Sequence, residues 1–217
     1  MQNHFDAILF DFDGVLADTE PIHCRCWAEV LRPLGIQLDW PSFEKEFVGI
    51  PDPQVVESLC SRNDPPVDFA LAWARHEQKQ QLFRARLLEA PPIPLPVIEL
   101  IRSLAASGYG LGLVTASARS EIEPVIERAG IRAPFQAAVY REDVERSKPA
   151  PDPYLRAARL LDAVRPLVVE DSEAGLASGR AAGFEVVRVA GPSDVPGKVR
   201  ARLLLSNDGG TQCVKNG

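Results

Sequence analysis

The segment from Ala7 to Asp13 sets the strongest constraint on how this chain can fold. The apolar run from Ala7 to Phe10 is too short for an ordinary helix and continuous enough for a strand buried on both faces. Asp11 and Asp13 follow it directly, and a buried strand has no structural use for two acids at its tip. Open parallel sheets bind ligands beyond the carboxyl ends of their strands, so we expect both acids at a ligand site. Because Asp-x-Asp-Gly also occurs in calcium loops and plain turns, this hypothesis needs support from other segments.

Two further apolar runs also end in polar residues. Residues 111–114 (Leu-Gly-Leu-Val) lead to Thr115, and residues 167–169 (Leu-Val-Val) lead to Glu170 and Asp171. Helical patterns alternate with such runs through the second half of the chain, and repeated strand–helix units imply a parallel sheet with helices on both faces. The three polar strand ends would lie along one edge of that sheet, where residues far apart in the sequence converge.

The segment between the first two strands has a different, all-helical pattern. Apolar residues recur at helical spacing from Ile22 to Leu34, and Gly35 ends the pattern. Further helices are predicted near residues 42–47, 53–60 and 68–88. The proline-rich stretch at residues 90–96 cannot be a helix interior or a central strand, so we interpret it as one connection to an inserted domain, with residues 16–18 as the other.

These patterns predict an α/β fold with two domains. The core is a Rossmann-like parallel sheet with helices on both faces, formed by residues 1–16 and 92–205. An all-helical cap domain over residues 17–91 is inserted into it. The polar, glycine-rich residues 206–217 are expected to form a flexible tail.

The charge of the chain excludes several classes of partner. The 217 residues carry a net charge of −6 at pH 7, and no cluster of Lys and Arg is dense enough for nucleic acid or an anionic membrane surface. An anionic substrate would therefore need a local positive source, such as a metal ion, a lysine or helix N-termini. We expect a small-molecule substrate, no nucleic-acid or membrane partner, and a monomer.

Cysteine usage and the N-terminal segment are typical of a cytoplasmic protein. The four cysteines, Cys24, Cys26, Cys60 and Cys213, have neither Cys-x-x-Cys nor zinc-site spacing, so we expect reduced thiols. Asp6 and Asp11 interrupt any signal-peptide core, and no apolar run approaches membrane-spanning length.

Lys148 is the candidate cation for the sheet edge. It lies in residues 147–153 (Ser-Lys-Pro-Ala-Pro-Asp-Pro), where the prolines fix a loop just before a predicted helix. A lone lysine is most often a solvated surface residue. Its place between the segments that carry the acids favours a catalytic role.

Four segments, in this order along the chain, resemble the motifs of the haloacid dehalogenase-like hydrolases. They are residues 11–16 (Asp-Phe-Asp-Gly-Val-Leu), 114–117 (Val-Thr-Ala-Ser), 148–153 (Lys-Pro-Ala-Pro-Asp-Pro) and 169–172 (Val-Glu-Asp-Ser). Residues 18–23 (Asp-Thr-Glu-Pro-Ile-His), followed by Trp27, are similar to the β-phosphoglucomutase-like branch, in which a small helical cap follows the first strand. The resemblance covers about the first 190 residues.

The resemblance implies a mechanism for the acids. Asp11 would be the nucleophile and form an aspartyl phosphate, and Asp13 would protonate the leaving oxygen and then take a proton from water. It also implies Mg²⁺, a hard cation that suits Asp11, the backbone carbonyl of Asp13 and Asp171, with Glu170 as a direct or water-bridged ligand.

The phosphoryl group would be held by residues of three segments. Thr115 would offer its hydroxyl and Ala116 its backbone N–H at a strand-to-helix turn, and Gly14 belongs to the same predicted phosphate site. Lys148 would pair with both Asp11 and the phosphate, which would otherwise repel each other. Thr115 alone could equally be a helix N-cap, and the acids at 170 and 171 could start a helix.

Substrate recognition is expected to come from the cap and from one residue near the phosphate turn. His23 and Trp27 are four residues apart and could share a helical face toward a substrate, although Trp27 suits a cap core equally well. Lys79 lies in a polar stretch that is more typical of an exposed lysine than of a substrate contact. The complete set of candidate substrate residues is His23, Trp27, Gly49, Lys79 and Arg119.

The leading functional hypothesis is a Mg²⁺-dependent phosphatase acting on a small phosphorylated metabolite, such as a sugar or sugar-acid phosphate. The alternative enzyme is a β-phosphoglucomutase-type sugar phosphomutase, but such mutases usually carry an arginine shortly after the cap glycine, where this chain has Gly-Ile-Pro-Asp-Pro at residues 49–53. Asp13 argues against phosphonate-cleaving enzymes and haloacid dehalogenases, which lack it. A binding module without activity would be expected to lose core motif residues, and none is missing.

Overall fold

The core of the protein is a five-stranded parallel sheet. The computed structural model describes residues 4–208, in which the strand order is β3-β2-β1-β4-β5. The strands are β1 (Ala7–Phe10), β2 (Gly110–Val114), β3 (Ala137–Val139), β4 (Pro166–Glu170) and β5 (Glu185–Arg188). Ile8 pairs with Leu111 on one side and with Leu167 on the other, so β1 occupies the centre of the sheet. This central position explains why every residue of β1 is apolar and buried.

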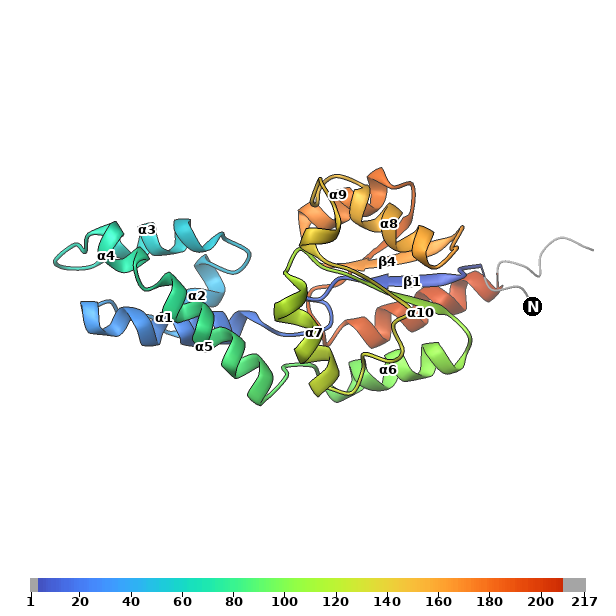
Figure 1. Cartoon of the computed structure of the whole chain (residues 1–217), viewed down its shortest axis with the longest axis horizontal. Helices are drawn as coiled ribbons and strands as arrows, with labels where there is room; N and C mark the ends of the chain where they lie inside the picture. Colours follow the sequence, from blue (N-terminus) through green and yellow to red (C-terminus); the bar gives the residue numbers. More distant parts are fainter. Residues whose placement is uncertain (1–3, 209–217) are drawn as a thin grey trace, which may run out of the picture. The chain divides into compact units, whose positions relative to one another are not determined.

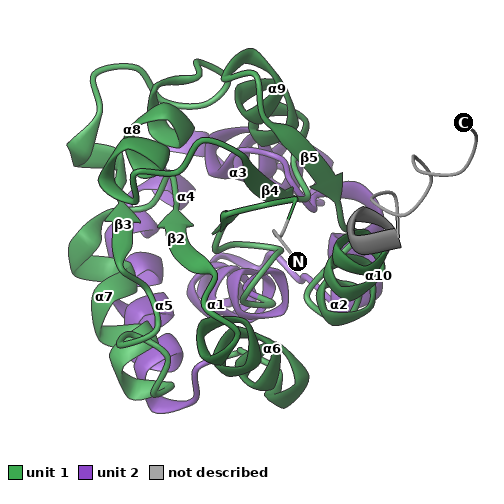
Figure 2. Ribbon diagram, turned by 90° about the vertical axis from the view of Figure 1, so that its right-hand side faces the viewer, with its two compact units in different colours: residues 1–18, 92–217 green, residues 19–91 purple. Residues whose placement is uncertain are grey.

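Helices cover both faces of the sheet, as Figures 1 and 2 show. On one face, α8 (Asp152–Leu160) packs against β1, β2 and β3, and α9 (Glu173–Ala181) packs against β4 and β5. On the other face, α6 (Leu95–Ala106) contacts β2 and α10 (Val195–Asp208) contacts β5. The remaining core helix is α7 (Arg119–Arg128). The predicted fold class is therefore confirmed.

Helix α10 was not predicted from the sequence. Val195 and Val199 are fully buried one helical turn apart, but a proline and a glycine between them obscure the helical pattern. The helix runs through Asp208, so the first three residues of the predicted tail, 206–208, are helical. Residues 209–217, which include Cys213, lie outside the described part of the chain.

Residues 19–91 form a second compact unit, separate from the unit of residues 1–18 and 92–217 (Figure 2). Its helices are α1 (Glu20–Leu31), α2 (Trp40–Glu46), α3 (Asp52–Arg62), α4 (Phe69–Trp73) and α5 (His76–Glu89). Short 3₁₀ helices occur at Arg32–Leu34 here and at Arg141–Asp143 in the core. Where the inserted segment leaves and rejoins the first unit, the Asp18 N–H donates to the Pro92 carbonyl over 2.9 Å. Among the described residues, none of the helices combines the length and the apolarity needed to cross a membrane.

The helix predicted over residues 68–88 is two helices. At their junction the Ala74 N–H donates to the carbonyls of Ala70 and Ala72, and the Arg75 N–H donates to the Ala72 carbonyl. These shorter-range hydrogen bonds tighten the backbone into a turn between α4 and α5. The sequence around this junction contains no proline or glycine, so the apolar pattern alone did not indicate the break between α4 and α5.

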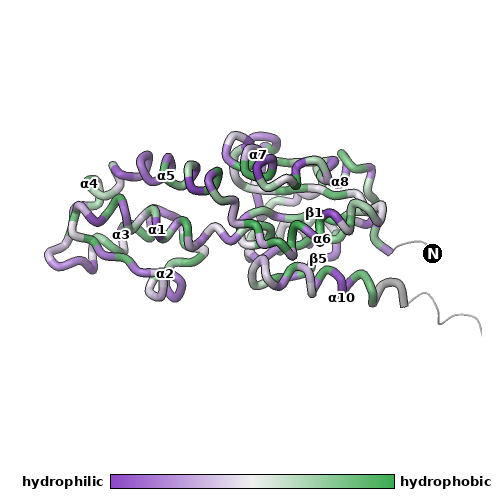
Figure 3. Tube along the Cα trace, turned by 90° about the horizontal axis from the view of Figure 1, so that it is seen from below, coloured by the Kyte–Doolittle hydropathy of each residue, from purple (hydrophilic) through white to green (hydrophobic). Residues whose placement is uncertain are grey.

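The interior of the cap contains a buried charged lysine. Lys79 is 0% exposed, although α5 is hydrophilic along most of its length (Figure 3). Its ammonium donates to His23 Nδ1 over 2.7 Å and to Asp52 Oδ2 over 2.8 Å, and it lies 5.2 Å from the ring centre of Trp27. The indole of Trp27 donates to the other oxygen of Asp52 over 2.9 Å. The expectation of an exposed lysine is wrong, because the partner that compensates its burial comes from α3.

His23 completes this cap cluster as an acceptor. Its ring stacks on Phe83 with a centroid distance of 3.9 Å. Burial, and then the charge of Lys79, lower the pKa of His23 to about 4. The ring is therefore neutral at pH 7, and Nδ1 can accept the hydrogen bond from Lys79. Trp27 is fully buried in the apolar core of the cap, the alternative that its helical spacing had left open.

Removing the Asp52 carboxylate should destabilise the cap strongly. In the Asp52→Ala variant the buried ammonium of Lys79 loses its anionic partner, so the free energy of unfolding should fall by about 3 kcal/mol. Glu46→Ala, which breaks the exposed ion pair with Arg62, is the matched control and should cost less than about 1 kcal/mol. Urea denaturation followed by tryptophan fluorescence measures this, because all three tryptophans lie in residues 19–91. Equal losses in the two variants would contradict the prediction.

Candidate active site

The polar residues at three strand ends meet at one edge of the sheet, as predicted from their positions. Asp11 follows β1, Thr115 follows the neighbouring β2, and Glu170 ends β4 on the other side of β1. The ladder continues one residue beyond β1, since the Asp11 N–H donates to the Val169 carbonyl over 3.1 Å. Asp11 is thus fixed as an extension of the central strand, with its side chain at the carboxyl edge.

Lys148 bridges two of these acids. Its Nζ lies 2.5 Å from Asp11 Oδ1, 2.6 Å from Glu170 Oε1 and 3.0 Å from the Val114 carbonyl oxygen. An ammonium group has three N–H donors, so these acceptors saturate it. Burial alone would lower the pKa of Lys148, but the carboxylates of Asp11 and Glu170 raise it above its ordinary value. The lysine is therefore a charged, fixed group at the sheet edge and not a solvated one.

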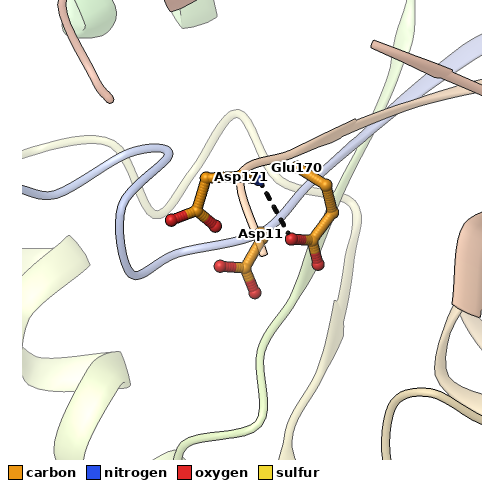
Figure 4. A group of neighbouring side chains, drawn as sticks. All are labelled: Asp11, Glu170 and Asp171. Atoms are coloured by element: carbon orange, nitrogen blue, oxygen red, sulfur yellow. Dashed lines mark hydrogen bonds between the residues drawn. The ribbon is translucent and has the colours of Figure 1, made fainter. Parts of the chain in front are cut away.

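Three carboxylates lie together at this edge of the sheet. Ligand oxygens of Asp11, Glu170 and Asp171 all lie within 4.8 Å of one another, and Figure 4 shows the three side chains gathered at the ends of β1 and β4. Burial raises the pKa of Asp11 despite the opposing effect of Lys148. Burial, and then the charge of Glu170, raise the pKa of Asp171 to about 6. One lysine does not balance this negative charge, and a set of carboxylate oxygens is the donor type that a hard divalent cation prefers.

The oxygens of Glu170 are occupied by hydrogen bonds from the protein. Oε2 accepts from the backbone N–H of Asp171 over 3.1 Å (Figure 4) and from both the N–H and the hydroxyl of Ser172. Oε1 accepts from Lys148 and from the Tyr154 hydroxyl, the latter over 2.7 Å. A carboxylate has about four lone-pair sites, so little capacity remains for direct metal coordination. Of the two alternatives for Glu170, this geometry favours the water-bridged one.

Two glycines let the backbone approach the acids closely. A Cβ at Gly14, where φ is +71°, would lie 2.0 Å from Asp171 Oδ2, and a Cβ at Gly175 would lie 1.8 Å from Glu170 Oε1. Gly14 was predicted as part of the phosphate site. Gly175 and Tyr154 were missed, since the signal for each is a contact with Glu170 and not a spacing within a motif.

The turn after β2 holds Asp13. The Ser117 hydroxyl donates to Asp13 Oδ2 over 3.0 Å, and the Ser117 N–H donates to Thr115 Oγ1 over 3.0 Å. Thr115 is buried and Ala116 is exposed on this turn. The Asp13 carboxylate is not a member of the cluster formed by the three other acids. Two acids that are two residues apart therefore have different surroundings, as distinct chemical roles require.

Four of the five candidate substrate residues belong to the cap unit and one belongs to the core unit. His23, Trp27 and Lys79 belong to the cap cluster, and the Gly49 N–H donates to Glu20 Oε1 over 3.3 Å within the same unit. Arg119 belongs to the core unit. Its guanidinium donates to both carboxylate oxygens of Asp143 over 3.1 and 2.9 Å and lies 4.2 Å from the ring centre of Tyr140.

Comparisons with known proteins agree with this geometry. A family model described as haloacid dehalogenase-like hydrolase matches residues 8–189. The chain is 31% identical over 193 residues to the fructose-1-phosphate phosphatase YqaB of Escherichia coli, covering 87% of this chain and 98% of that protein. It is 32% identical over 203 residues to hexitol phosphatase A of the same species, covering 92% and 89%. A crystal structure of β-phosphoglucomutase from Clostridium difficile shares the fold with a TM-score of 0.63 at 20% identity, covering 91% and 90%.

The chain belongs to the haloacid dehalogenase-like hydrolases. The predicted family is therefore confirmed, and the likeness to a β-phosphoglucomutase structure at 20% identity shows a shared fold. The predicted enzyme class, a phosphatase, is supported by the names of its relatives.

Adding a methyl group at Gly175 should disturb the site. In Gly175→Ala the new Cβ collides with the buried Glu170 carboxylate, and the free energy of unfolding should fall by about 1–3 kcal/mol. Gly197→Ala is a matched control: both glycines are the third residue of their helices, and a Cβ at Gly197 meets nothing within 4 Å. The control should be neutral or more stable by up to about 1 kcal/mol. If chemical denaturation finds the two variants equally stable, the close approach at Gly175 is refuted.

Proposed function

We propose that this protein is a Mg²⁺-dependent phosphatase that hydrolyses a small phosphorylated metabolite, a sugar or sugar-acid phosphate, through an aspartyl-phosphate intermediate. The observation that carries the proposal is the bridge from Lys148 to Asp11 and Glu170, with the Asp13 carboxylate hydrogen-bonded to Ser117. Relatives named for phosphorylated carbohydrates, the fructose-1-phosphate and hexitol phosphatases, support the substrate class. The net charge of −6 favours a small substrate over a polyanion.

Asp11 is the nucleophile in this mechanism. One of its carboxylate oxygens bonds to phosphorus as the bond between phosphorus and the ester oxygen breaks, which gives an aspartyl phosphate and an alcohol. Asp13 protonates the departing ester oxygen. It then takes a proton from the water that attacks phosphorus, which releases inorganic phosphate and restores both carboxyl groups.

The groups that hold the phosphoryl oxygens lie at the same sheet edge. The ammonium of Lys148 is already fixed beside Asp11, so it can stabilise charge on the transferred group without moving far. Thr115 supplies a hydroxyl and Ala116 a backbone N–H from the turn after β2, and Gly14 keeps the turn after β1 free of a side chain. These contacts do not depend on the group to which the phosphate is attached.

The acidic cluster fits Mg²⁺. Asp11, the Asp13 carbonyl and Asp171 would hold the ion, and Glu170 would act through water because its own oxygens are occupied. When bound, the ion neutralises negative charge between the phosphate and the carboxylates. Burial, and to a smaller extent the charge of Glu170, raise the pKa values of Asp11 and Asp171, and a bound cation would favour their ionised forms.

We also infer a monomeric, cytoplasmic enzyme. The three described cysteines, Cys24, Cys26 and Cys60, are free and buried, which supports a reducing compartment.

Replacing the nucleophile should abolish turnover. Asp11→Asn keeps the shape of the side chain but removes its charge, so hydrolysis of para-nitrophenyl phosphate should fall by more than about a thousandfold. Asp162→Asn is the matched control, because Asp162 has a φ of 50° that asparagine tolerates and lies outside the site. Released nitrophenol measures both variants in the presence of Mg²⁺. Appreciable Mg²⁺-dependent turnover by Asp11→Asn would exclude the nucleophile assignment.

A sugar phosphomutase is the second candidate, since a β-phosphoglucomutase shares the fold. It would need the cap to hold a second phosphate. In residues 49–53, where such mutases usually carry an arginine, this chain has an acid, Asp52, whose carboxylate accepts from Lys79 and Trp27. We therefore infer hydrolysis as the main reaction.

Product analysis separates the two reactions. Incubated with hexose 1-phosphates and Mg²⁺, the enzyme should release inorganic phosphate and form no hexose 6-phosphate, because water and not a second sugar hydroxyl accepts the phosphoryl group. Phosphorus NMR distinguishes the products directly. The Asp11→Asn variant is the blank for both reactions. Hexose 6-phosphate as the main product would assign the protein to the mutases.

A further inference from the structure

Tyr154 is a buried tyrosine with its hydroxyl in the acidic cluster. It is the third residue of α8, is 0% exposed, and its hydroxyl donates to Glu170 Oε1 over 2.7 Å. The same oxygen accepts from the ammonium of Lys148 over 2.6 Å. That ammonium also lies 5.1 Å from the centre of the tyrosine ring. One side chain therefore contacts Lys148 through its face and Glu170 through its hydroxyl.

Packing alone does not explain the hydroxyl. The ring belongs to an apolar cluster with Leu9, Val114, Ala157 and Val168, where phenylalanine would fill the same space. Burying a hydroxyl in such surroundings is unfavourable unless the group is hydrogen-bonded. The hydrogen bond to Glu170 Oε1 is the contact that makes the buried hydroxyl favourable.

The loop that carries Lys148 leads directly into α8, the helix that carries Tyr154. Three residues separate Lys148 from the start of α8 at Asp152. Within them, the Ala150 N–H donates to the Ser147 carbonyl over 3.0 Å, and the Ala150 carbonyl accepts from the Ser178 hydroxyl of α9 over 2.6 Å. The ammonium and the hydroxyl thus reach Glu170 from one fixed segment.

We propose that Tyr154 is a positioning residue for the reaction: its hydroxyl holds Glu170 so that the shared Lys148 remains directed at Asp11 and the transferred phosphoryl group. This inference rests on the proposed function, which it deepens. With two donors on Oε1, the Glu170 carboxylate cannot rotate freely. The hydrogen bond from the Tyr154 hydroxyl also stabilises the negative charge on this oxygen, which weakens its attraction for the Lys148 ammonium. Without the hydroxyl, Glu170 competes more strongly with Asp11 for Lys148.

Kinetics of Tyr154→Phe test this role. The variant keeps the ring and its packing, so it should fold and its KM for para-nitrophenyl phosphate should stay within about twofold of the wild-type value. Its kcat should fall about tenfold, because one hydrogen bond to a charged group is lost. Tyr140→Phe is the matched control. Tyr140 is also fully buried and its hydroxyl donates to a carboxylate, that of Glu123, outside the proposed machinery. It should keep the wild-type kcat even if its melting temperature falls by the same amount.

A double-mutant cycle shows whether the effect passes through Glu170. In a Glu170→Gln background the further change Tyr154→Phe should lower kcat by much less than in the wild type, because the carboxylate that the hydroxyl holds is gone. Equal losses in both backgrounds, or an unchanged kcat in Tyr154→Phe alone, would overturn the inference.

A readout that needs no turnover separates this inference from the proposed function. The ¹⁵N ammonium NMR signal of Lys148 should be sharp and slow to exchange with water in the wild type and in Tyr140→Phe, and should broaden in Tyr154→Phe. Identical signals in all three proteins would refute the positioning role whether or not the protein hydrolyses phosphate esters. Failure of the wild type to hydrolyse any phosphate ester, with the NMR difference present, would refute the proposed function alone.

Discussion

The site depends on the interactions of the buried Lys148 ammonium with its three acceptors. It joins Asp11, at the end of the central strand, to Glu170 on the neighbouring strand β4, and it reaches the carbonyl of Val114 on β2, the neighbour on the other side. Removing charged groups from water is unfavourable unless each is paired and hydrogen-bonded, so these groups constrain one another's positions. The parallel sheet brings them together, and their mutual compensation makes a charged cluster tolerable at its edge.

Much of the core could be predicted from the sequence because strand ends in a parallel sheet must meet. Asp11, Thr115 and Glu170 each follow or end an apolar run, and the order of the motifs identified the family. Contacts made by side chains across elements could not be predicted in this way. Tyr154 and Gly175 matter through Glu170, and no spacing in the sequence encodes either contact.

The cap shows the same limit more strongly. The polar residues around Lys79 predict a solvated helix face. Lys79 is buried because Asp52, from another helix, compensates its charge and the neutral His23 ring accepts a hydrogen bond from it. Local composition reports the average surroundings of a segment and not the partner of one residue. Helix α10 was missed for a related reason, since a proline and a glycine in its first turn are compatible with a helix start but resemble a loop.

The hydrogen bond between Asp18 and Pro92 has a consequence for how such proteins diversify. The two chain ends of the insertion are adjacent. Residues 19–91 therefore connect two neighbouring points of the core, as a single tight turn would. A segment of almost any length can be exchanged at such a junction without changing the register of the strands on either side. Replacement of the inserted domain as one cassette is therefore a route by which a fixed catalytic core can acquire new specificities.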